Sequence, residues 1–362
     1  NIIDRLRAIK NPDEQALMQI ASTKNDAIMA KVKAFIKIGQ SEQEIADYFA
    51  LRGRIPTDNN WKQADVIEGC EVLYNKNGTA PGIFVSEGEK TVILLPGPPL
   101  ELKSMFTDSV MPRLQQKCGQ VFYSETVKIV GPGESSVETQ ILDMLNTQEN
   151  PTIAPYAKTG EVHLRVTARA KDEKEAKEKT APVVEELYRR FGNAVYTTDA
   201  DETLEMALTK LLMKKKYTMT TAESCTGGMI AARMVNAPGV SAVLKSGFIA
   251  YANEAKEELL GVSHDTLEKF GAVSRETAEE MAEGAAKAAH TDTAVAVTGI
   301  AGPDGGTKEK PVGLVYIGVN VRGNVEVREY HFSGSRQKIR ESVTAAALTF
   351  LREKLLDTRE RG

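Results

Sequence analysis

The stretch Thr220-Thr-Ala-Glu-Ser-Cys-Thr-Gly-Gly228 decides how the fold of this chain is interpreted. Residues 217–222 are rich in β-forming side chains, and residues 229–235 have the composition of a helix. Residues 223–228 are therefore predicted to form a tight turn that leads from a strand into a helix.

This turn carries the groups that a serine nucleophile needs. The hydroxyl of Ser224 lies on it, and the glycines that follow let the backbone come close to a ligand. Backbone N–H groups at the helix start would face the same point and stabilise negative charge, as an oxyanion hole does. The alternative is an ordinary turn with a Ser or Thr N-cap. The candidate substrate-binding residues of the turn are Glu223, Cys225, Thr226, Gly227 and Gly228.

A candidate base for Ser224 is Lys256. Residues 248–252 resemble a strand, Asn253 is the expected N-cap, and residues 254–260 form a predicted helix that ends at Gly261. A lysine in the first turn meets the positive end of the helix dipole, so its pKa should fall and it can act as a general base. The alternative is a lysine that is simply solvated.

A Ser/His/Asp triad is a less natural proposal than a Ser/Lys pair, because no histidine of the chain lies in an obvious catalytic turn. Cys225 is a rival nucleophile, although a reactive thiol usually has a histidine or a cation beside it.

The composition is that of an ordinary globular protein of 362 residues, with 41% apolar residues and a net charge of −4. Neither nucleic acid nor a membrane is therefore an expected partner. Three cysteines argue for a reducing, cytoplasmic location and against a disulfide framework or a cysteine metal site. The start lacks a signal peptide's apolar core and an initiator Met, so we expect a fragment or a processed product.

The chain is expected to be an α/β multidomain protein with four parts: residues 1–50, 51–118, 119–199 and 200–362. Residues 1–50 have apolar side chains at helical spacing and weakly resemble the start of the pita-bread aminopeptidases, without their metal ligands. We interpret them as structural helices.

Residues 51–118 contain a predicted strand at 91–95, followed by a Pro-Gly loop and a helix. The blocks Gly78-Thr-Ala-Pro-Gly82 and Leu95-Pro-Gly-Pro-Pro-Leu-Glu-Leu-Lys103 resemble the molybdopterin-binding-like domain of the CinA (competence-damage-inducible) family. Two motifs of that domain's first half, Gly-Thr-Glu-Leu-Leu and Gly-Gly-Leu-Gly-Pro-Thr, are missing from this sequence. The resemblance therefore implies only a partial domain.

Residues 119–199 are expected to form a small α+β module, with strands at 127–130 and 161–168 and helices at 134–142 and 172–191. The block at residues 150–157 resembles the KH-like middle domain of the CinA family. We see no Gly-x-x-Gly clamp in a basic context, so nucleic acid is not an expected partner. His163 is expected to be structural.

Residues 200–362 continue with predicted helices at 204–215 and 274–289 and a buried strand at 293–297. A glycine-rich loop follows this strand. Ligands bind in such loops in open α/β sheets, although a plain mobile loop is the alternative. The candidate substrate-binding residues here are Thr298, Gly299, Gly302 and Gly305. A hairpin from 312–321 to 325–332 and a helix at 335–356 complete the domain.

Along its whole length, this last part resembles the C-terminal domain of the CinA family. That family includes nicotinamide mononucleotide deamidases. The matching blocks are residues 222–228, 251–256, 271–274, 298–303 and 310–313. The resemblance implies an α/β amidohydrolase with Ser224 as nucleophile, Lys256 as base and Tyr251 as a proton or hydrogen-bond partner, with Asn253 near the substrate. It implies no metal or cofactor, nicotinamide mononucleotide as substrate, and a homodimer.

Two other functions stay open at this point. One is a metal-dependent pyrophosphatase acting on ADP-ribose, which is associated with the family's N-terminal domain. The other is a non-catalytic interaction protein in competence or DNA repair.

Overall fold

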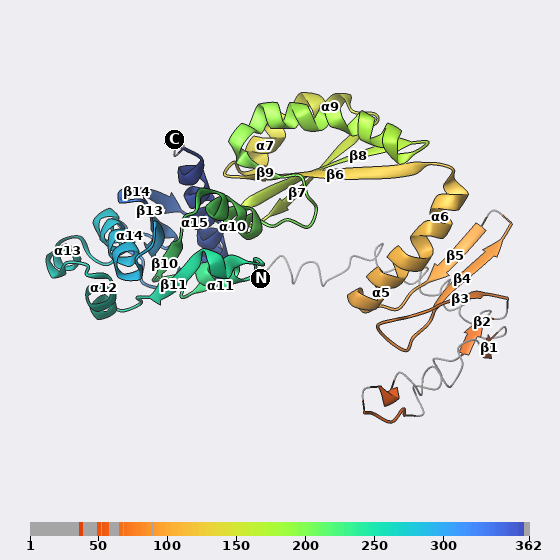
Figure 1. Cartoon of the computed structure of the whole chain (residues 1–362), viewed down its shortest axis with the longest axis horizontal. Coiled ribbons are helices and arrows are strands. Elements are labelled where there is room, and N and C mark those ends of the chain that lie inside the picture. Colours follow the sequence, from red (N-terminus) through yellow and green to blue (C-terminus); the bar gives the residue numbers. More distant parts are fainter. Residues whose placement is uncertain are drawn as a thin grey trace, which may run out of the picture. The chain divides into compact units, whose positions relative to one another are not determined.

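The computed structural model describes residues 36–38, 49–51, 53–57, 65–67, 69–88 and 90–357. The chain divides into two compact units, residues 1–119 and residues 120–362 (Figure 1). It is a mixed α/β multidomain protein, as predicted. The finer division at residues 50, 118 and 199 stays a prediction. No helix in the described part of the chain is long and apolar enough to cross a membrane.

The first unit contains a strand where a helix was predicted. β1 (Ile36–Ile38) pairs antiparallel with β2 (Asp65–Ile67). The helical interpretation is therefore wrong at Ile36, because β-branched residues are well suited to a strand and local propensity yields to long-range pairing. The helices predicted within residues 1–35 lie outside the described residues, and so do residues 39–48.

Residues 69–118 of this unit, apart from residue 89, form a small antiparallel sheet followed by a helical segment. The strands are β3 (Glu71–Leu73), β4 (Gly82–Glu87) and β5 (Lys90–Leu94), in that order. The helical segment runs through α5 (Pro99–Met105), η2 (Phe106–Val110) and α6 (Met111–Cys118). Leu73, Phe84, Met105 and Val110 form its buried core. The predicted order of strand, Pro-Gly loop and helix is confirmed.

The KH-like module, residues 120–199 of the second unit, is a four-stranded antiparallel sheet with helices. Its strands are β6 (Val121–Val130), β7 (Thr152–Lys158), β8 (Glu161–Ala170) and β9 (Val195–Thr197), in the order β7-β8-β6-β9. Its helices are α7 (Glu134–Gln140), α8 (Leu142–Thr147) and α9 (Glu173–Phe191), and η3 (Gly192–Ala194) follows. The predicted helix 134–142 is thus interrupted at Ile141, and the strand at 127–130 begins earlier, at Val121.

The C-terminal domain is built on one five-stranded sheet in the order β11-β10-β12-β13-β14. Its strands are β10 (Met219–Glu223), β11 (Leu244–Ile249), β12 (Thr293–Gly299), β13 (Leu314–Val321) and β14 (Asn324–His331). β10 runs parallel to β11 and β12, whereas the pairs β12–β13 and β13–β14 are antiparallel. The predicted hairpin 312–332 is confirmed as β13 and β14.

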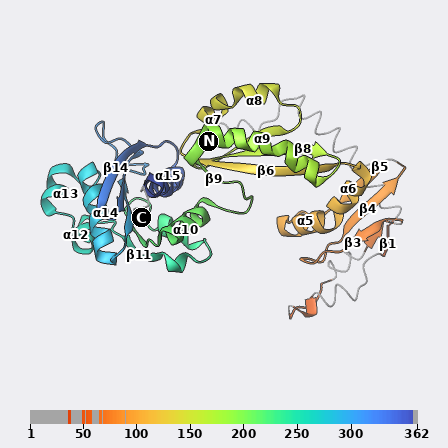
Figure 2. The same cartoon turned by 45° about the horizontal axis from the view of Figure 1, so that its top comes forward.

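Helices cover both faces of this sheet. α12 (Asn253–Leu260), α13 (His264–Phe270) and α14 (Arg275–Ala289) lie together on one side, as Figure 2 shows. α10 (Leu204–Lys215), α11 (Met229–Val235) and α15 (Arg336–Asp357) pack together on the other. Along β12, Ala294 and Ala296 join the core beneath α14, while Val295 and Val297 join the core beneath α15. This alternation makes the domain a three-layer α/β/α sandwich.

Two boundaries near the predicted site differ from expectation. The strand predicted at 248–252 is β11, which begins at Leu244 and ends at Ile249. Asn253 is the first residue of α12 rather than its N-cap; Ala252 holds the N-cap position, without a side-chain hydrogen bond. The chain therefore leaves the sheet earlier, and Tyr251 lies in the connection between strand and helix.

Candidate active site

The candidate active site lies at one edge of the C-terminal sheet. β10, β11 and β12 are parallel neighbours, so their carboxyl ends meet at the same edge. Ser224 directly follows β10, Tyr251 follows β11, and the glycine-rich loop follows β12. This is the edge at which open α/β sheets bind their ligands.

Ser224 and Lys256 are brought together at this edge. Lys256 Nζ lies 3.3 Å from Ser224 Oγ, and 3.0 Å from the backbone oxygens of both Ala250 and Tyr251. The lysine side chain is 1% exposed, and this burial lowers the pKa of Lys256 below its ordinary value of 10.5. The sequence predicted a lowered pKa from the helix dipole, whereas burial is the main cause in the structure.

Lys256 must be a neutral amine to act as a base. Such an amine has two N–H groups and one lone pair. The two N–H groups can be donated to the carbonyl oxygens of Ala250 and Tyr251, which leaves the lone pair for the hydroxyl proton of Ser224. A third carbonyl, that of Ala252, lies 3.5 Å from Nζ and is a further acceptor beside the ammonium that forms when Lys256 takes up the proton. The geometry is that of a serine with a general base.

Glu223 holds the turn rather than facing a ligand. Its buried carboxylate accepts hydrogen bonds from the backbone N–H groups of Gly228, Ile230 and Ala231 at 2.9–3.0 Å. The positive helix start predicted for an anion is thus occupied by the protein's own carboxylate. Both of its oxygens are engaged with the backbone, and its assignment to substrate binding stays a prediction.

The same contacts determine which N–H groups of the turn are available for the predicted oxyanion hole. The Gly228 N–H group is bound to Glu223, and the Gly227 N–H group donates to the Ser224 carbonyl. The N–H groups of Cys225 and Thr226 donate to no acceptor in the described part of the chain. They are the two turn donors that stay free for an oxyanion. Gly227 and Gly228 have φ values of +58° and +94°, so the turn needs glycine at both positions.

Two arginines of α15 complete the site, and the sequence did not indicate them. Arg340 donates through Nε to the Cys225 carbonyl at 3.1 Å and through Nη2 to the Thr226 carbonyl at 2.6 Å. Arg336 donates to the Gly302 carbonyl at 2.7 Å and to the Tyr251 hydroxyl at 3.1 Å. Their spacing of four residues places both on one helix face, but only the tertiary fold shows that this face meets the Ser224 turn.

The other predicted residues differ in how they could serve the site. Thr298 is buried and donates its hydroxyl to the Ala272 carbonyl at 2.5 Å, and Gly299 leaves room for Val315, so both serve packing. Gly302 is held by Arg336, and Gly305 is exposed with φ +87°. Tyr251 and Asn253 are exposed at the end of β11 and the start of α12.

Cys225 is poorly suited to act as a nucleophile. Its side chain is 6% exposed, and burial raises the pKa of the Cys225 thiol to about 11. Since the thiolate is the reactive form, the thiol is inert near neutral pH. The structure therefore favours Ser224 over Cys225.

The helix after the turn is tied to the KH-like module. Arg233 of α11 donates to Glu161 of β8 at 2.7 Å and to Glu205 of α10 at 3.0 Å. Burial opposes the charge on Glu161, but hydrogen bonds from His163, Tyr196 and Arg233 hold the pKa of Glu161 at about 2. His163 lies 3.2 Å from Glu161 and belongs to this network, which is a structural role.

Comparisons with known proteins give a consistent picture. Residues 201–355 match the family model of the CinA C-terminal domain, and residues 124–197 match that of the damage-inducible protein CinA KH domain. A putative competence-damage inducible protein of Clostridium beijerinckii is 50% identical over 324 residues, which are 90% of this chain and 79% of that protein. A CinA-like protein of Dictyoglomus thermophilum is 48% identical over 318 residues, which are 88% of this chain and 77% of that protein.

Solved structures of similar sequence cover a little under half of this chain. The competence/damage inducible protein CihA from Agrobacterium tumefaciens is 42% identical, covers 44% of this chain and 99% of its own, and has a TM-score of 0.41. A CinA superfamily protein from Klebsiella pneumoniae is 34% identical, covers 43% of this chain and 97% of its own, and has a TM-score of 0.42.

Proposed function

This chain belongs to the CinA family of competence-damage inducible proteins, and we propose that its C-terminal domain is a Ser/Lys amidohydrolase acting on nicotinamide mononucleotide. The observation that carries the proposal is the contact between the buried Lys256 Nζ and Ser224 Oγ, at 3.3 Å. The products are nicotinate mononucleotide and ammonia.

The first half of the reaction forms an acyl-enzyme. Neutral Lys256 accepts the hydroxyl proton of Ser224 as Oγ bonds to the carboxamide carbon of the substrate. The oxyanion that forms is stabilised by the free N–H groups of Cys225 and Thr226. When the C–N bond breaks, the Lys256 ammonium gives its proton to the departing nitrogen, and ammonia leaves.

The second half uses the same groups on water. Lys256, neutral again, accepts a proton from a water molecule as its oxygen bonds to the acyl carbon. The bond to Ser224 Oγ then breaks, and the lysine returns the proton to Oγ. The acid is released, and both side chains are restored for the next turnover.

The choice of substrate rests on the resemblance of the C-terminal blocks to nicotinamide mononucleotide deamidases. One feature of the site supports it. Arg336 is exposed on α15 and bridges the Tyr251 hydroxyl and the Gly302 carbonyl, so a cation stands beside the glycine-rich loop. A guanidinium in this position suits the phosphate of a mononucleotide. A homodimer and a cytoplasmic location belong to the same proposal.

The test is ammonia release from nicotinamide mononucleotide by the whole chain, compared with Ser224→Ala. We expect release by the wild type and a loss of several orders of magnitude in the variant, with an unchanged unfolding temperature. Mass spectrometry should detect an acyl adduct on the tryptic peptide that contains Ser224. Equal rates of ammonia release by both proteins would overturn the mechanism. If the wild type released ammonia only from other amides, the assignment of nicotinamide mononucleotide as substrate would be wrong.

A further inference from the structure

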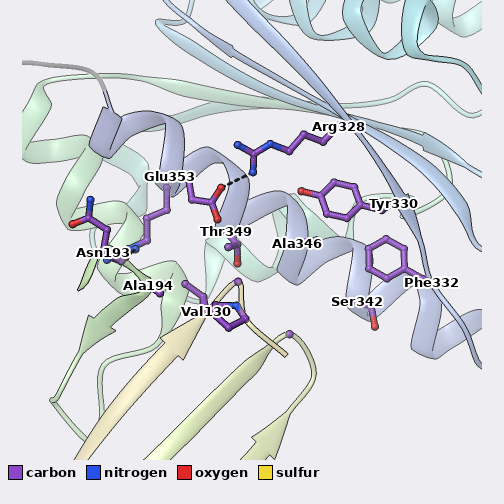
Figure 3. Close-up of a pocket in the computed structure, with 14 residues that line it drawn as sticks. Val130, Asn193, Ala194, Arg328, Tyr330, Phe332, Ser342, Ala346, Thr349 and Glu353 are labelled. Carbon is purple, nitrogen blue, oxygen red and sulfur yellow. Dashed lines mark hydrogen bonds and ion pairs between the residues drawn. The ribbon is translucent and has the colours of Figure 1, made fainter. Parts of the chain in front are cut away.

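A cavity lies between the KH-like module and the C-terminal domain, apart from the Ser224 turn. It has a volume of about 670 Å³. One wall is formed by β14 and α15, and the other by the end of β6, the turn before β8, and η3 (Figure 3). β14 is an edge strand of the sheet, whereas Ser224 follows β10, so the two sites are separate. The volume is within the range of small-molecule sites, which often lie between domains.

The β14 wall of this cavity is aromatic. Tyr330 belongs to β14, and Phe332 directly follows the end of this strand at His331. Their rings are stacked, with centroids 5.6 Å apart and planes inclined by 10°. Figure 3 shows both rings on one side of the cavity and Val130 with Ala194 on the opposite side. Walls of this kind accept a planar ring.

The charges around the cavity leave one cation without an anionic partner. Arg328 and Glu353 pair with each other at 2.5 Å, and Arg328 also binds Glu326. Arg352 is 8% exposed and donates only to the backbone carbonyls of Asn193 and Val195. Among the described residues it forms no ion pair within 4 Å. Glu353 acts on Arg352 electrostatically but is already paired with Arg328, so a negative group in the cavity would be favoured beside Arg352.

Two hydroxyl groups in the lining are also available. Ser342 and Thr349 of α15 form no side-chain hydrogen bond with the described part of the chain. Each can donate to an anion or to a ring nitrogen, or accept from an amino group. The cavity thus offers an aromatic face, a cation and two adaptable polar groups.

We propose that this cavity binds a planar aromatic molecule that carries a phosphate or a carboxylate, with the ring against Tyr330 and Phe332 and the anion beside Arg352. The ligand contacts both the KH-like module and the C-terminal domain, so its binding also fixes these two parts against each other.

The test is calorimetric titration of the whole chain with two probes, adenosine 5′-monophosphate for a phosphate and 2-naphthoate for a carboxylate. Adenosine, naphthalene-2-methanol and inorganic phosphate are the controls that lack either the anion or the ring. We expect at least one probe to bind about tenfold or more tightly than its uncharged counterpart, which corresponds to about 1.4 kcal/mol.

Substitutions in the lining of the cavity test whether the probe binds there. Ser342→Phe fills the cavity and Phe332→Leu removes half of the aromatic pair, and each should weaken the probe about tenfold or more. Arg352→Gln should reduce the affinity of the anionic probe to that of the neutral one. Arg336→Ala, at the Ser224 site, is the matched control and should leave this binding unchanged, which also separates it from any binding at the proposed active site. Circular dichroism and thermal unfolding confirm that each variant folds.

Binding of neither probe would overturn the proposal. Binding that survives both Ser342→Phe and Phe332→Leu would do so too, because the probe would then occupy another part of the molecule.

Discussion

Lys256 Nζ lies 3.3 Å from Ser224 Oγ, although 32 positions separate the two residues in the chain. The contact arises because β10 and β11 are parallel neighbours and each ends at the same edge of the sheet. Ser224 follows the first strand directly, and α12 carries Lys256 back over the end of the second. The first three predictions depend on this pair.

Replacing Lys256 by Met should remove amidase activity while the fold is kept. Methionine is unbranched like lysine and fills the same buried space without a base, so kcat should fall by about 10²–10⁴-fold, the usual contribution of a general base. Initial rates of ammonia release measure this. Lys245→Met is the matched control, since Lys245 is an exposed lysine of β11. Comparable activity in wild type and Lys256→Met would exclude the lysine as the base.

The amidase rate should rise with pH through a pKa below 10.5. Burial lowers the pKa of Lys256, and only its neutral form can accept the Ser224 proton, so kcat/KM increases as the lysine loses its proton. A profile of kcat/KM against pH should therefore reach a plateau before the pH at which ordinary lysines titrate. A rate that is flat or falling across this range would contradict the assignment.

The same shift makes stability depend on pH. Between the lowered pKa of folded Lys256 and 10.5, the unfolded chain binds more protons, so the free energy of unfolding should increase with pH in that window. The difference in urea-unfolding free energy between wild type and Lys256→Met isolates this contribution. If this difference decreased or stayed constant with pH, the pKa of Lys256 would not be lowered in the folded state.

The predictable parts of this site are those encoded by local sequence. Ser224 lies in the turn between β10 and α11, and Lys256 lies in the first turn of α12, after β11. Such strand-to-helix connections carry their own signals in glycine and in helix composition. The contacts of Glu223 with the N–H groups at the start of α11 were not predicted, because they depend on how the helix turns back over the strand. Arg340 was missed because nothing local distinguishes it from other arginines of α15.

The same reasoning explains the errors in the fold. The long helices α9, α14 and α15 were predicted well because their apolar spacing extends over many residues. The strand β1 was missed because its partner β2 is distant in the sequence. Tertiary pairing decides such short segments, and no local pattern reports it.

Cys225 should be dispensable for catalysis. Its thiol is buried and its pKa is raised to about 11, so Cys225→Ala should keep most of the activity, and iodoacetamide should not inactivate the native enzyme at pH 7. Mass spectrometry of the alkylated protein, before and after unfolding in urea, measures the protection. Rapid alkylation of native Cys225 with loss of activity would restore the thiol as a rival nucleophile.

Removing the carboxylate of Glu223 should destabilise the domain and disorder the turn. Three backbone N–H groups would lose their acceptor in a buried place, which costs about 1–3 kcal/mol for each unsatisfied group. Glu223→Ala should therefore unfold at a lower urea concentration than Glu223→Gln, which keeps one acceptor oxygen. An equal loss in kcat with no change in stability would instead indicate direct contact with the substrate.

Arg340 should act on the rate through the orientation of one peptide group. The Cys225 carbonyl that it binds belongs to the same peptide as the Thr226 N–H group, one of the two free donors of the turn. Rotation of this peptide would aim its oxygen at the developing oxyanion and its N–H group away. Arg340→Met should therefore lower kcat by up to about 10²–10³-fold, the loss expected for one oxyanion donor, with little change in KM.

Arg336→Met is the matched control for this positioning role. Arg336 binds the Gly302 carbonyl and the Tyr251 hydroxyl but no carbonyl of the turn, so its loss should raise KM more than it lowers kcat. If Arg340→Met merely damaged the fold, kcat, KM and the unfolding temperature would all change together. If Arg340→Met raised only KM, as Arg336→Met should, the guanidinium would be a substrate contact and the turn would hold its peptide without it.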